Sequence, residues 1–532
     1  MFVKNIKAGN HTYVQIVESY KENGISKHRV LLNLGRIENI KGNKGFKRMI
    51  DSLYELMEIN KLNIDDISSA DILNYGYIAY KKLWDNFGLS SILNKKDICG
   101  NIDFSLNDTS FLMSLTHLLD PQSKLSVYNH KNRYFNLPNV KLHNLYRSLD
   151  ILSKNKERIE EHLFYKKRDL FNLSLDVVFY DVTTFYFESV KKDSLKDFGF
   201  SKDNKLNEVQ VVMGLLIDKE GLPVGYELFP GNTFEGKTLE ASLEKLGKRF
   251  NIKRVIIVAD KGMNSRMNLK KIHDMGFTYI ISSRLKSFKK QMLNEIFSKD
   301  GYMREKNYSY KKIDCLNKNK GYEIKENLIV TYSDERALLD KKKREKLVKK
   351  AQEYTDKPSL IKASSKRGGK KYIKETGNCS FSLDEESISK DEALDGYYAL
   401  QTNELGLSPK EIINAYHNLW KIEESFRIMK STMEVRPVFH WTEKRIKGHF
   451  VVCFLSFLLE RTLEFKLKEK TIGFSSEKIK EALNSLNFAK VELRDKQYLI
   501  KTKSPKLATD ILTAFRIKHP KNITPLSEIN IT

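Results

Sequence analysis

The sequence predicts an α/β protein whose sheet domain is interrupted by a basic insertion and preceded by a mostly helical region. Strand and helix patterns alternate between about residues 175 and 285. Lysine-rich, turn-rich sequence then breaks this rhythm until Asp395–Thr402 restores strand character. Residues 45–165 instead carry apolar positions at helical spacing. With 532 residues and 40% hydrophobic residues, the chain can bury more than one core.

The first 170 residues are expected to form two parts. Thr12–Tyr20 and Arg29–Leu34 alternate polar and apolar residues around the turn-like Lys21–Gly24, which predicts a β-hairpin module over residues 1–40. Residues 41–170 are expected to be a helical, DNA-binding region, although a plain helical scaffold fits equally well because no DNA-binding motif is legible. Its helical segments are Ile72–Phe87, Ser110–Leu119 and Leu142–Leu163.

The expected catalytic domain combines residues 171–285 with 396–465. Its first part has the order β-β-β-α-β-α-β, with two of the strands joined by the turn-like Asp218–Gly221. These elements are Leu175–Phe187, Glu208–Ile217, Leu222–Phe229, Leu239–Phe250, Arg254–Asp260, Ser265–Met275 and Tyr279–Ser283. Residues 286–395 form the lysine-rich, turn-rich insertion, and 466–532 form a C-terminal region without a diagnostic pattern.

The charge of the chain favours a polyanionic partner, and double-stranded DNA is the simplest choice. Lys and Arg number 93 against 68 Asp and Glu, a net charge of +25. Leu338–Glu375 alone carries fourteen basic and five acidic residues, as a solvated surface segment or a phosphate-binding one would. No run of about 18 apolar residues and no signal-peptide core is present, so we expect a cytoplasmic protein, nucleoid-associated when bound to DNA, with no membrane partner.

Cysteine and histidine give no recognisable metal motif. Four scattered cysteines exclude a disulfide framework or paired zinc knuckle, and the eleven histidines show no His-Glu-x-x-His or comparable ligand spacing. Any metal is therefore expected on carboxylates.

Two aspartates stand where structural acids seldom do. Asp181 interrupts an apolar strand, and Asp260 ends another. Burying an isolated charge costs several kcal/mol unless it is compensated, and metal coordination is a natural compensation. For Asp260 the alternative is a helix cap or turn former.

A later helix offers a third acid. Ser408–Glu411 reads as a capping box with proline at the first helical position, so the helix should begin just before Tyr416. At about 100° per residue, one sector roughly 80° wide then holds a tyrosine, a leucine, an acid and two cations, while Glu424 points elsewhere. These residues are Tyr416, Leu419, Glu423, Arg427 and Lys430. A surface salt bridge is the alternative for Glu423.

Asp181, Asp260 and Glu423 together are hard oxygen ligands suited to Mg²⁺ or Mn²⁺. Two such ions can activate water or a 3′-hydroxyl on one side of a phosphate and stabilise the leaving oxygen on the other. The expected chemistry is therefore phosphodiester cleavage and transfer.

These residues resemble the Asp-Asp-Glu (DDE) transposases of bacterial insertion sequences, in the branch with a Tyr-Arg-Glu-Lys signature. Tyr416, position 419, Glu423 and Lys430 reproduce the signature spacing, but Leu419 fills the Arg slot, as in a subgroup with Leu-Trp there. Arg427 is the suggested substitute. Further resemblance lies in Tyr180–Thr184, Gly199–Asp203, Gly221–Gly225, Phe229–Asn232 and Val258–Gly262, so that it covers roughly residues 175–460.

The resemblance implies a ribonuclease-H-like core with a β-rich insertion between the second acid and Glu423. It also implies two metal ions held by Asp181, Asp260 and Glu423, and cut-and-paste transposition by a homodimer that holds two transposon ends. Tyr416 and Lys430 would contact DNA phosphates.

Two other functions fit parts of the sequence. Gly231–Thr238 matches the Walker A pattern of P-loop ATPases, with a Walker-B-like strand ending at Asp260. Against this, Glu235 would repel phosphate and Phe234 adds bulk where such loops approach their ligand closely. A transposase-derived protein that binds DNA without catalysis is the second alternative, and the intact set of acids argues against it.

Overall fold

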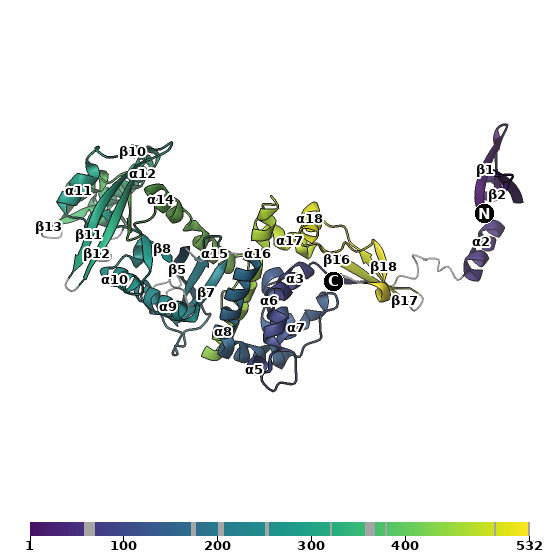
Figure 1. Ribbon diagram of the computed structural model, residues 1–532, viewed down its shortest axis with the longest axis horizontal. Helices are drawn as coiled ribbons and strands as arrows, with labels where there is room; N and C mark the ends of the chain where they lie inside the picture. The colour runs from purple at the N-terminus through teal and green to yellow at the C-terminus, as the bar shows by residue number, and fades with distance from the viewer. Residues whose placement is uncertain are drawn as a thin grey trace. The chain divides into compact units, whose positions relative to one another are not determined.

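The computed structural model describes residues 1–57, 70–171, 177–199, 207–250, 255–319, 322–356, 368–377, 380–493 and 496–529 (Figure 1). The chain divides into two compact units. Unit 1 comprises Met1–Asp71, Lys490–Ile500 and Ile523–Glu528, and unit 2 comprises Ile72–Ala489, Lys501–Asn522 and Ile529–Thr532. This division is coarser than the five parts expected from the sequence, whose boundaries stay a prediction.

The N-terminal part of unit 1 is a three-stranded antiparallel meander followed by short helices. The expected hairpin is formed by β2 and β3, and its turn uses Asn23 and Gly24 at φ 51° and 80°, as a tight hairpin turn requires. The elements are β1 (Phe2–Ala8), β2 (His11–Glu22), β3 (Ile25–Arg36), α1 (Ile37–Ile40) and α2 (Lys44–Leu56). In the C-terminal part, β17 (Lys496–Lys501) pairs with β18 (Ile523–Pro525).

Unit 2 contains a nine-stranded mixed sheet in the order β10-β11-β12-β15-β9-β8-β5-β6-β7. Strands β5, β6 and β7 form two antiparallel hairpins, whereas β8 and β9 run parallel to β5. The strands are β5 (Val177–Tyr186), β6 (Gln210–Asp218), β7 (Pro223–Pro230), β8 (Ile256–Ala259), β9 (Thr278–Ser282), β10 (Met303–Arg304), β11 (Ser309–Asn319), β12 (Tyr322–Tyr332) and β15 (Tyr397–Thr402). The predicted mixed α/β class is therefore confirmed.

The long strands of the insertion extend this sheet. β12 pairs with β15, and β15 pairs with β9, so the insertion continues the hydrogen-bonded ladder beyond the core strands. A small core of its own forms around Ile296, Ile313 and Val330. The sequence did not predict that the inserted strands would join the core sheet. The insertion also holds α11 (Lys290–Phe297), α12 (Asp334–Asp356), β13 (Ile373–Gly377), β14 (Ser380–Leu383) and α13 (Glu385–Glu392).

The two faces of the central strands have different neighbours. On one face Tyr180 is buried, and its hydroxyl donates to Thr238 of α9 (Glu235–Phe250). The same face packs on α10 (Arg266–Asp274). Helix α15 (Trp420–Lys430) contacts β5 and β6, and α16 (Glu443–Glu469) contacts β7. Phe185 of β5 meets Phe450 of α16 edge to face, with ring centroids 5.3 Å apart.

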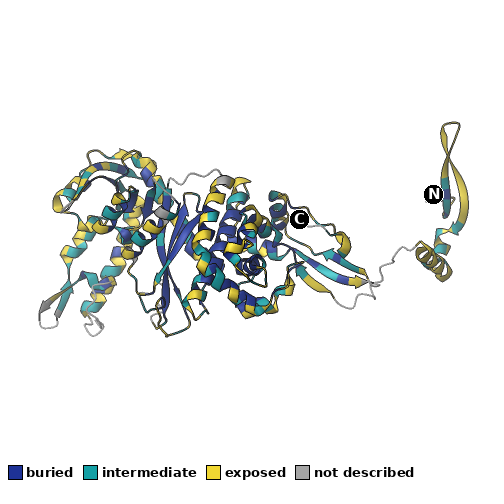
Figure 2. Cartoon of the chain, turned by 60° about the horizontal axis from the view of Figure 1, so that its bottom comes forward, coloured by how far each residue is buried: buried dark blue, intermediate teal, exposed yellow. Residues whose placement is uncertain are grey.

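The helical region packs around α16, whose residues 448–464 are all buried. α16 contacts α3, α6 and α8, and it is apolar all round because it lies inside the region rather than on its surface. Figure 2 shows this concentration of buried residues in the helices beside the sheet. The other helices are α3 (Ile78–Asn86), α4 (Leu89–Leu93), α5 (Lys96–Cys99), α6 (Leu106–Leu119), α7 (Lys124–Asn129), α8 (Leu142–Phe171), α17 (Ser476–Asn484) and α18 (Lys506–Ala514).

The first helix predicted from the sequence begins too early. Asp71–Asn74 forms β4, and α3 starts only at Ile78.

Among the described residues, no helix combines the length and apolar character needed to cross a membrane.

The close approach of α8 and α16 depends on Gly448. A Cβ added there would lie 2.0 Å from the carbonyl oxygen of Leu149, a backbone atom that cannot move aside easily. We expect Gly448→Ala to lower the free energy of unfolding by about 1–3 kcal/mol through overpacking. Urea unfolding followed by circular dichroism measures this. Gly473→Ala is the matched control, because a Cβ there meets nothing within 4 Å; equal losses would contradict the packing argument.

A buried carboxyl on α16 should make stability depend on pH. Burial, reinforced by the charge of Glu464, raises the pKa of Glu460 to about 7, and the Tyr80 hydroxyl donates to Glu460 Oε2 at 2.5 Å. Because the folded-state pKa exceeds the unfolded value, this stabilisation is complete below the unfolded pKa of about 4.5 and is lost as pH rises to about 7. We expect Glu460→Gln to weaken the dependence of the thermal unfolding midpoint on pH between those two pKa values. An unchanged slope would contradict the assignment.

Candidate active site

The pairing of β5 with β8 places Asp181 and Asp260 side by side. The strands are parallel, with Val177 opposite Ile256 and Phe179 opposite Val258. Continued by two residues, this register sets Asp181 beside Asp260, one strand spacing away, or about 4.8 Å between backbones. Asp260 follows the last residue of β8 in extended conformation, and its side chain does not cap the short helix after it. The side-chain cap alternative for Asp260 is therefore wrong, although its carbonyl accepts from the Met263 N–H at 3.0 Å and so begins a turn.

Both aspartates lie on the same face of the sheet. Side chains alternate along a strand, so Asp181 points away from the face that buries Tyr180 and Val182. On β8, Ile257 and Ala259 belong to that same buried core, and Asp260 alternates with them. The two acids therefore face the side on which α15 contacts β5. Asp181 is half-buried and Asp260 is exposed.

The third acid lies on a helix that is shorter than predicted. The predicted capping box is present: Ser408 Oγ accepts from the Glu411 backbone N–H, and Glu411 accepts from the Ser408 N–H at 2.8 Å. α14 (Pro409–His417) then ends, and Asn418–Leu419 forms a turn before α15 begins at Trp420.

This break corrects the predicted single helical face. Through the turn, Leu419 N–H bonds to the Tyr416 carbonyl and Ile422 N–H to the Leu419 carbonyl, which tightens the winding to three residues per turn. Leu419 is buried, at 8% exposure, whereas Glu423 and Arg427 are exposed. Position 419 therefore does not share a surface with Glu423, and its leucine serves packing.

Tyr416 is directed at the second aspartate. Its hydroxyl donates to Asp260 Oδ1 at 3.5 Å and accepts from the Tyr398 hydroxyl at 2.6 Å. Burial raises the pKa of Tyr416 well above its usual value, and Tyr398 and the Asp260 carboxylate raise it further. Tyr416 therefore stays protonated as a donor to Asp260. Sequence reasoning missed Tyr398, although its strand was predicted; nothing in the local pattern marks it.

Glu423 and its neighbour Glu424 have different environments. Glu424 accepts from Arg461 of α16 at 3.2 Å and pairs with Arg427 at 3.5 Å. Within the described residues Glu423 has neither a hydrogen bond nor an ion pair, so the salt-bridge alternative applies to Glu424 and not to Glu423. The predicted distinction between these two adjacent glutamates agrees with the structure.

Two contacts, one on each side of Glu423 in the sequence, show where it lies along the sheet. Seven residues before it, Tyr416 reaches Asp260; seven residues after it, the Lys430 ammonium lies 5.9 Å from the Phe185 ring centroid. Phe185 is four residues beyond Asp181 and on the same face of β5. α15 therefore runs from the level of the aspartates along β5, with Glu423 in its first turn.

The three acids do not converge as a set. Among the described residues, the one group of three potential metal ligands within 4.8 Å of each other consists of His117, His449 and Cys453. Like charges repel, which favours an open arrangement of three carboxylates. The donor set is nonetheless of the oxygen type that Mg²⁺ and Mn²⁺ prefer, and Asp260 and Glu423 are exposed to receive an ion.

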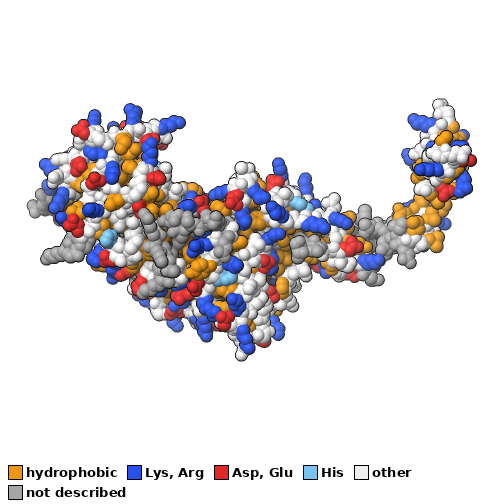
Figure 3. All heavy atoms as spheres, in the orientation of Figure 1, with side chains coloured by type: hydrophobic (Ala, Val, Ile, Leu, Met, Phe, Trp, Pro, Cys, Tyr) orange, Lys and Arg blue, Asp and Glu red, His pale blue; other side chains and the backbone are white. Residues whose placement is uncertain are grey.

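A basic cavity of about 560 Å³ opens beside Asp260. Lys261 and Arg284 line it from the core, and Arg336 and Lys343 line it from α12 of the insertion. Tyr398, which donates to Tyr416, is also part of the lining, and the Arg336 guanidinium lies 4.5 Å from its ring centroid. In Figure 3, Lys and Arg side chains are scattered over the insertion, among hydrophobic and acidic side chains. The insertion therefore brings positive charge to the acids.

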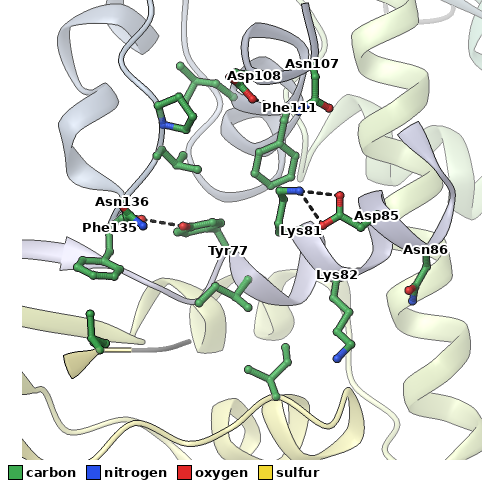
Figure 4. A pocket seen from close by; sticks show the side chains of 16 residues that line it. Tyr77, Lys81, Lys82, Asp85, Asn86, Asn107, Asp108, Phe111, Phe135 and Asn136 are labelled. Carbon is green, nitrogen blue, oxygen red and sulfur yellow. Dashed lines mark hydrogen bonds and ion pairs between the residues drawn. The ribbon is translucent and has the colours of Figure 1, made fainter. Parts of the chain in front are cut away.

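A second pocket, of about 590 Å³, lies in the helical region and contains none of the three acids. Figure 4 shows Tyr77, Lys81 and Phe111 in its wall, with the Lys81 ammonium bound to both carboxylate oxygens of Asp85 at 2.6 Å. Lys81 and Asp85 therefore neutralise each other, and neither charge is left free to bind a ligand.

Comparison with known families decides the identity. The family described as transposase DDE domain matches residues 173–459, more than half of the chain. The chain belongs to the DDE transposases. A second family, described as the N-terminal domain of IS1634 family transposases, matches residues 2–61. This DDE transposase therefore catalyses transposition, by DNA cleavage and strand transfer, as the resemblance implied.

Solved structures resemble this DDE transposase only distantly. The synaptic complex of the piggyBac transposase with hairpin DNA is 9% identical and has a TM-score of 0.38; the match covers 79% of this chain and 82% of that one. The paired-end complex of the Mos1 transposase with its left transposon end is 13% identical, with a TM-score of 0.15. That match covers 32% of this chain and 57% of the Mos1 chain. No curated protein matches.

The P-loop alternative is wrong for the DDE transposase. β7, which precedes Gly231, pairs antiparallel with β6, and both β6 and β5 separate it from β8. A Cβ at Gly231 would lie 2.2 Å from the Gln210 carbonyl oxygen, so this glycine serves close backbone packing. Thr238 is buried and accepts from Tyr180 instead of facing a ligand.

The adjacent glutamates allow a matched test. We expect Glu424→Ala to lower the free energy of unfolding by about 1–2 kcal/mol, because it removes one of the two carboxylates that pair with the buried Arg461 guanidinium. Glu423→Ala should leave stability unchanged. Thermal unfolding of both variants measures the difference, and equal destabilisation would contradict the distinct environments.

Proposed function

We propose that Asp181, Asp260 and Glu423 are the catalytic acids and that together they hold two Mg²⁺ or Mn²⁺ ions for cut-and-paste transposition. The observation that carries this proposal is the in-register pairing of β5 and β8, which sets two aspartates side by side on one face. Glu423, exposed and unpaired among the described residues, follows on the helix that contacts this face. The family membership supplies the reaction class.

The core supports a ribonuclease-H-like assignment. Its first five strands and two helices follow the β-β-β-α-β-α-β order predicted from the sequence pattern, with β5 paired to both β6 and β8. The insertion stands between Asp260 and Glu423.

Bound metal ions would supply Lewis-acid activation of water or a 3′-hydroxyl and stabilisation of the leaving oxygen. The residues of the chain then have distinct tasks. Asp181 and Asp260 offer carboxylate oxygens from rigid strands, and the Tyr416 hydroxyl fixes the orientation of Asp260 through its donated hydrogen bond. Glu423 offers a third carboxylate from α15.

The transposase would bind double-stranded DNA along the basic cavity beside Asp260. Lys261 and Lys343 are suitable phosphate contacts because they line this cavity, next to the site and on the insertion respectively. Arg427 and Lys430 remain proposed contacts on α15; Arg427 is exposed although it also pairs with Glu424. Transposition joins two ends, so we propose a homodimer as the active assembly.

Substitution of each acid tests the assignment. We expect Asp181→Ala, Asp260→Ala and Glu423→Ala each to reduce Mg²⁺-dependent cleavage of a duplex carrying the inverted repeat that flanks the gene by at least about a hundredfold. Binding of the duplex, measured by fluorescence anisotropy, should stay within about threefold because these residues lie among the ligands and not the phosphate contacts.

Asp274→Ala is the control: this acid is exposed on α10 and pairs with Lys270. It should cleave normally. Full cleavage by all three variants of the proposed acids would overturn the site while leaving the family assignment intact.

A further inference from the structure

A second cluster of metal-binding side chains lies in the helical region, away from the acids. His117 is near the end of α6, and His449 and Cys453 are one turn apart on α16. One ligand atom from each of these three residues lies within 4.8 Å of the others. All three side chains are buried, with exposures of 5%, 6% and 0%.

One ring nitrogen in this cluster is buried without a partner. His117 Nδ1 lies 3.4 Å from the Met433 carbonyl oxygen. In the tautomer that donates to this carbonyl, Nε2 carries the lone pair. Within the described residues, the buried His117 Nε2 has no hydrogen-bond partner. A buried unsatisfied polar atom costs about 1–3 kcal/mol, so this nitrogen requires an explanation.

The separation of the ligand atoms fits one tetrahedral ion. His449 Nε2 and Cys453 Sγ are 3.5 Å apart. Typical zinc–nitrogen and zinc–sulfur bonds at a tetrahedral angle place such atoms roughly 3.6 Å apart. An i, i+4 pair on a helix presents both groups to the same side, and His117 approaches from the facing helix.

We propose that His117, His449 and Cys453 bind one Zn²⁺ ion, or another borderline-soft divalent ion, as a structural site distinct from the catalytic ions. Imidazole and thiolate ligands favour zinc over Mg²⁺ and Mn²⁺, which prefer oxygen. Binding forms a metal–sulfur bond and releases the Cys453 thiol proton to solvent, while each histidine binds through an unprotonated nitrogen.

A third histidine, His440, lies beside the cluster. Its ring centroid is 4.9 Å from that of His449, but its ring nitrogens do not belong to the group of ligand atoms that lie within 4.8 Å of one another. The protein therefore offers three ligands, and a water would fill the fourth tetrahedral position.

Lys124 of α7 is buried near the cluster, so its positive charge opposes a bound cation. The thiolate formed on binding offsets part of the ion's charge.

The site would join two helices of unit 2. α6 supplies His117, and α16 supplies His449 and Cys453. The neighbour of His449, Phe450, packs on Phe185 of β5. Zinc would therefore fix the helical region against the strand that carries Asp181.

Cobalt substitution tests the site in the full-length, untagged protein. The wild type should bind one Co²⁺ per chain, with the visible bands of tetrahedral cobalt and a near-ultraviolet thiolate-to-cobalt charge-transfer band, and Zn²⁺ should displace it. Cys453→Ser should abolish the charge-transfer band, and His117→Gln should weaken Co²⁺ binding at least about tenfold. Asp181→Asn should keep the full spectrum, which separates this site from the catalytic acids.

Cys315→Ser and His273→Gln are matched controls outside the cluster and should bind cobalt normally. Far-ultraviolet circular dichroism verifies that each variant folds. Added Zn²⁺ should raise the thermal midpoint of the wild type but not of Cys453→Ser. A wild type that binds no cobalt, or a charge-transfer band that survives Cys453→Ser, would overturn the proposal.

Discussion

The parallel pairing of β5 with β8 is the constraint on which the site depends. In an antiparallel pair the ends of neighbouring strands point in opposite directions, whereas parallel strands end together at one edge. Here the register sets Asp181 of β5 beside Asp260, at the end of β8. The apolar residues on the opposite face hold both strands against α9 and α10, so the acids cannot turn inward without exposing that core.

The remaining parts of the catalytic unit are attached to this pair of strands. The insertion continues the sheet through β12 and β15, and Tyr398 of β15 reaches the site through the Tyr416 hydroxyl. On the other side, α16 packs on Phe185, while Arg461 holds Glu424. An added segment and a helical region thus support the same few carboxylates through backbone pairing and buried contacts, which is how a rigid scaffold keeps such groups in place.

Local patterns predicted the parts of this structure that depend on local forces. An acid inside an apolar strand singled out Asp181, and the Ser408–Glu411 capping box located the start of α14. The break at Asn418–Leu419 could not be read in the same way, because both residues have helical backbone angles and neither is a glycine or proline. The joining of β12 to β15, and the meeting of His117 with His449, bring together residues distant in sequence. The four-residue spacing of His449 and Cys453 is the one local feature that could have indicated the second cluster, and the sequence patterns considered did not include it.

The burial of α16 has consequences for the synthesis of the protein and for truncated copies of its gene. α16 fills the space between α3, α6 and α8, which are synthesised several hundred residues earlier. At roughly 5–20 residues per second, those helices wait for tens of seconds with apolar faces exposed before their common partner leaves the ribosome. A gene copy truncated before α16 would therefore encode a chain without its core, prone to aggregation and proteolysis. Shortened copies of this kind would be lost as protein instead of persisting as folded competitors for the transposon ends.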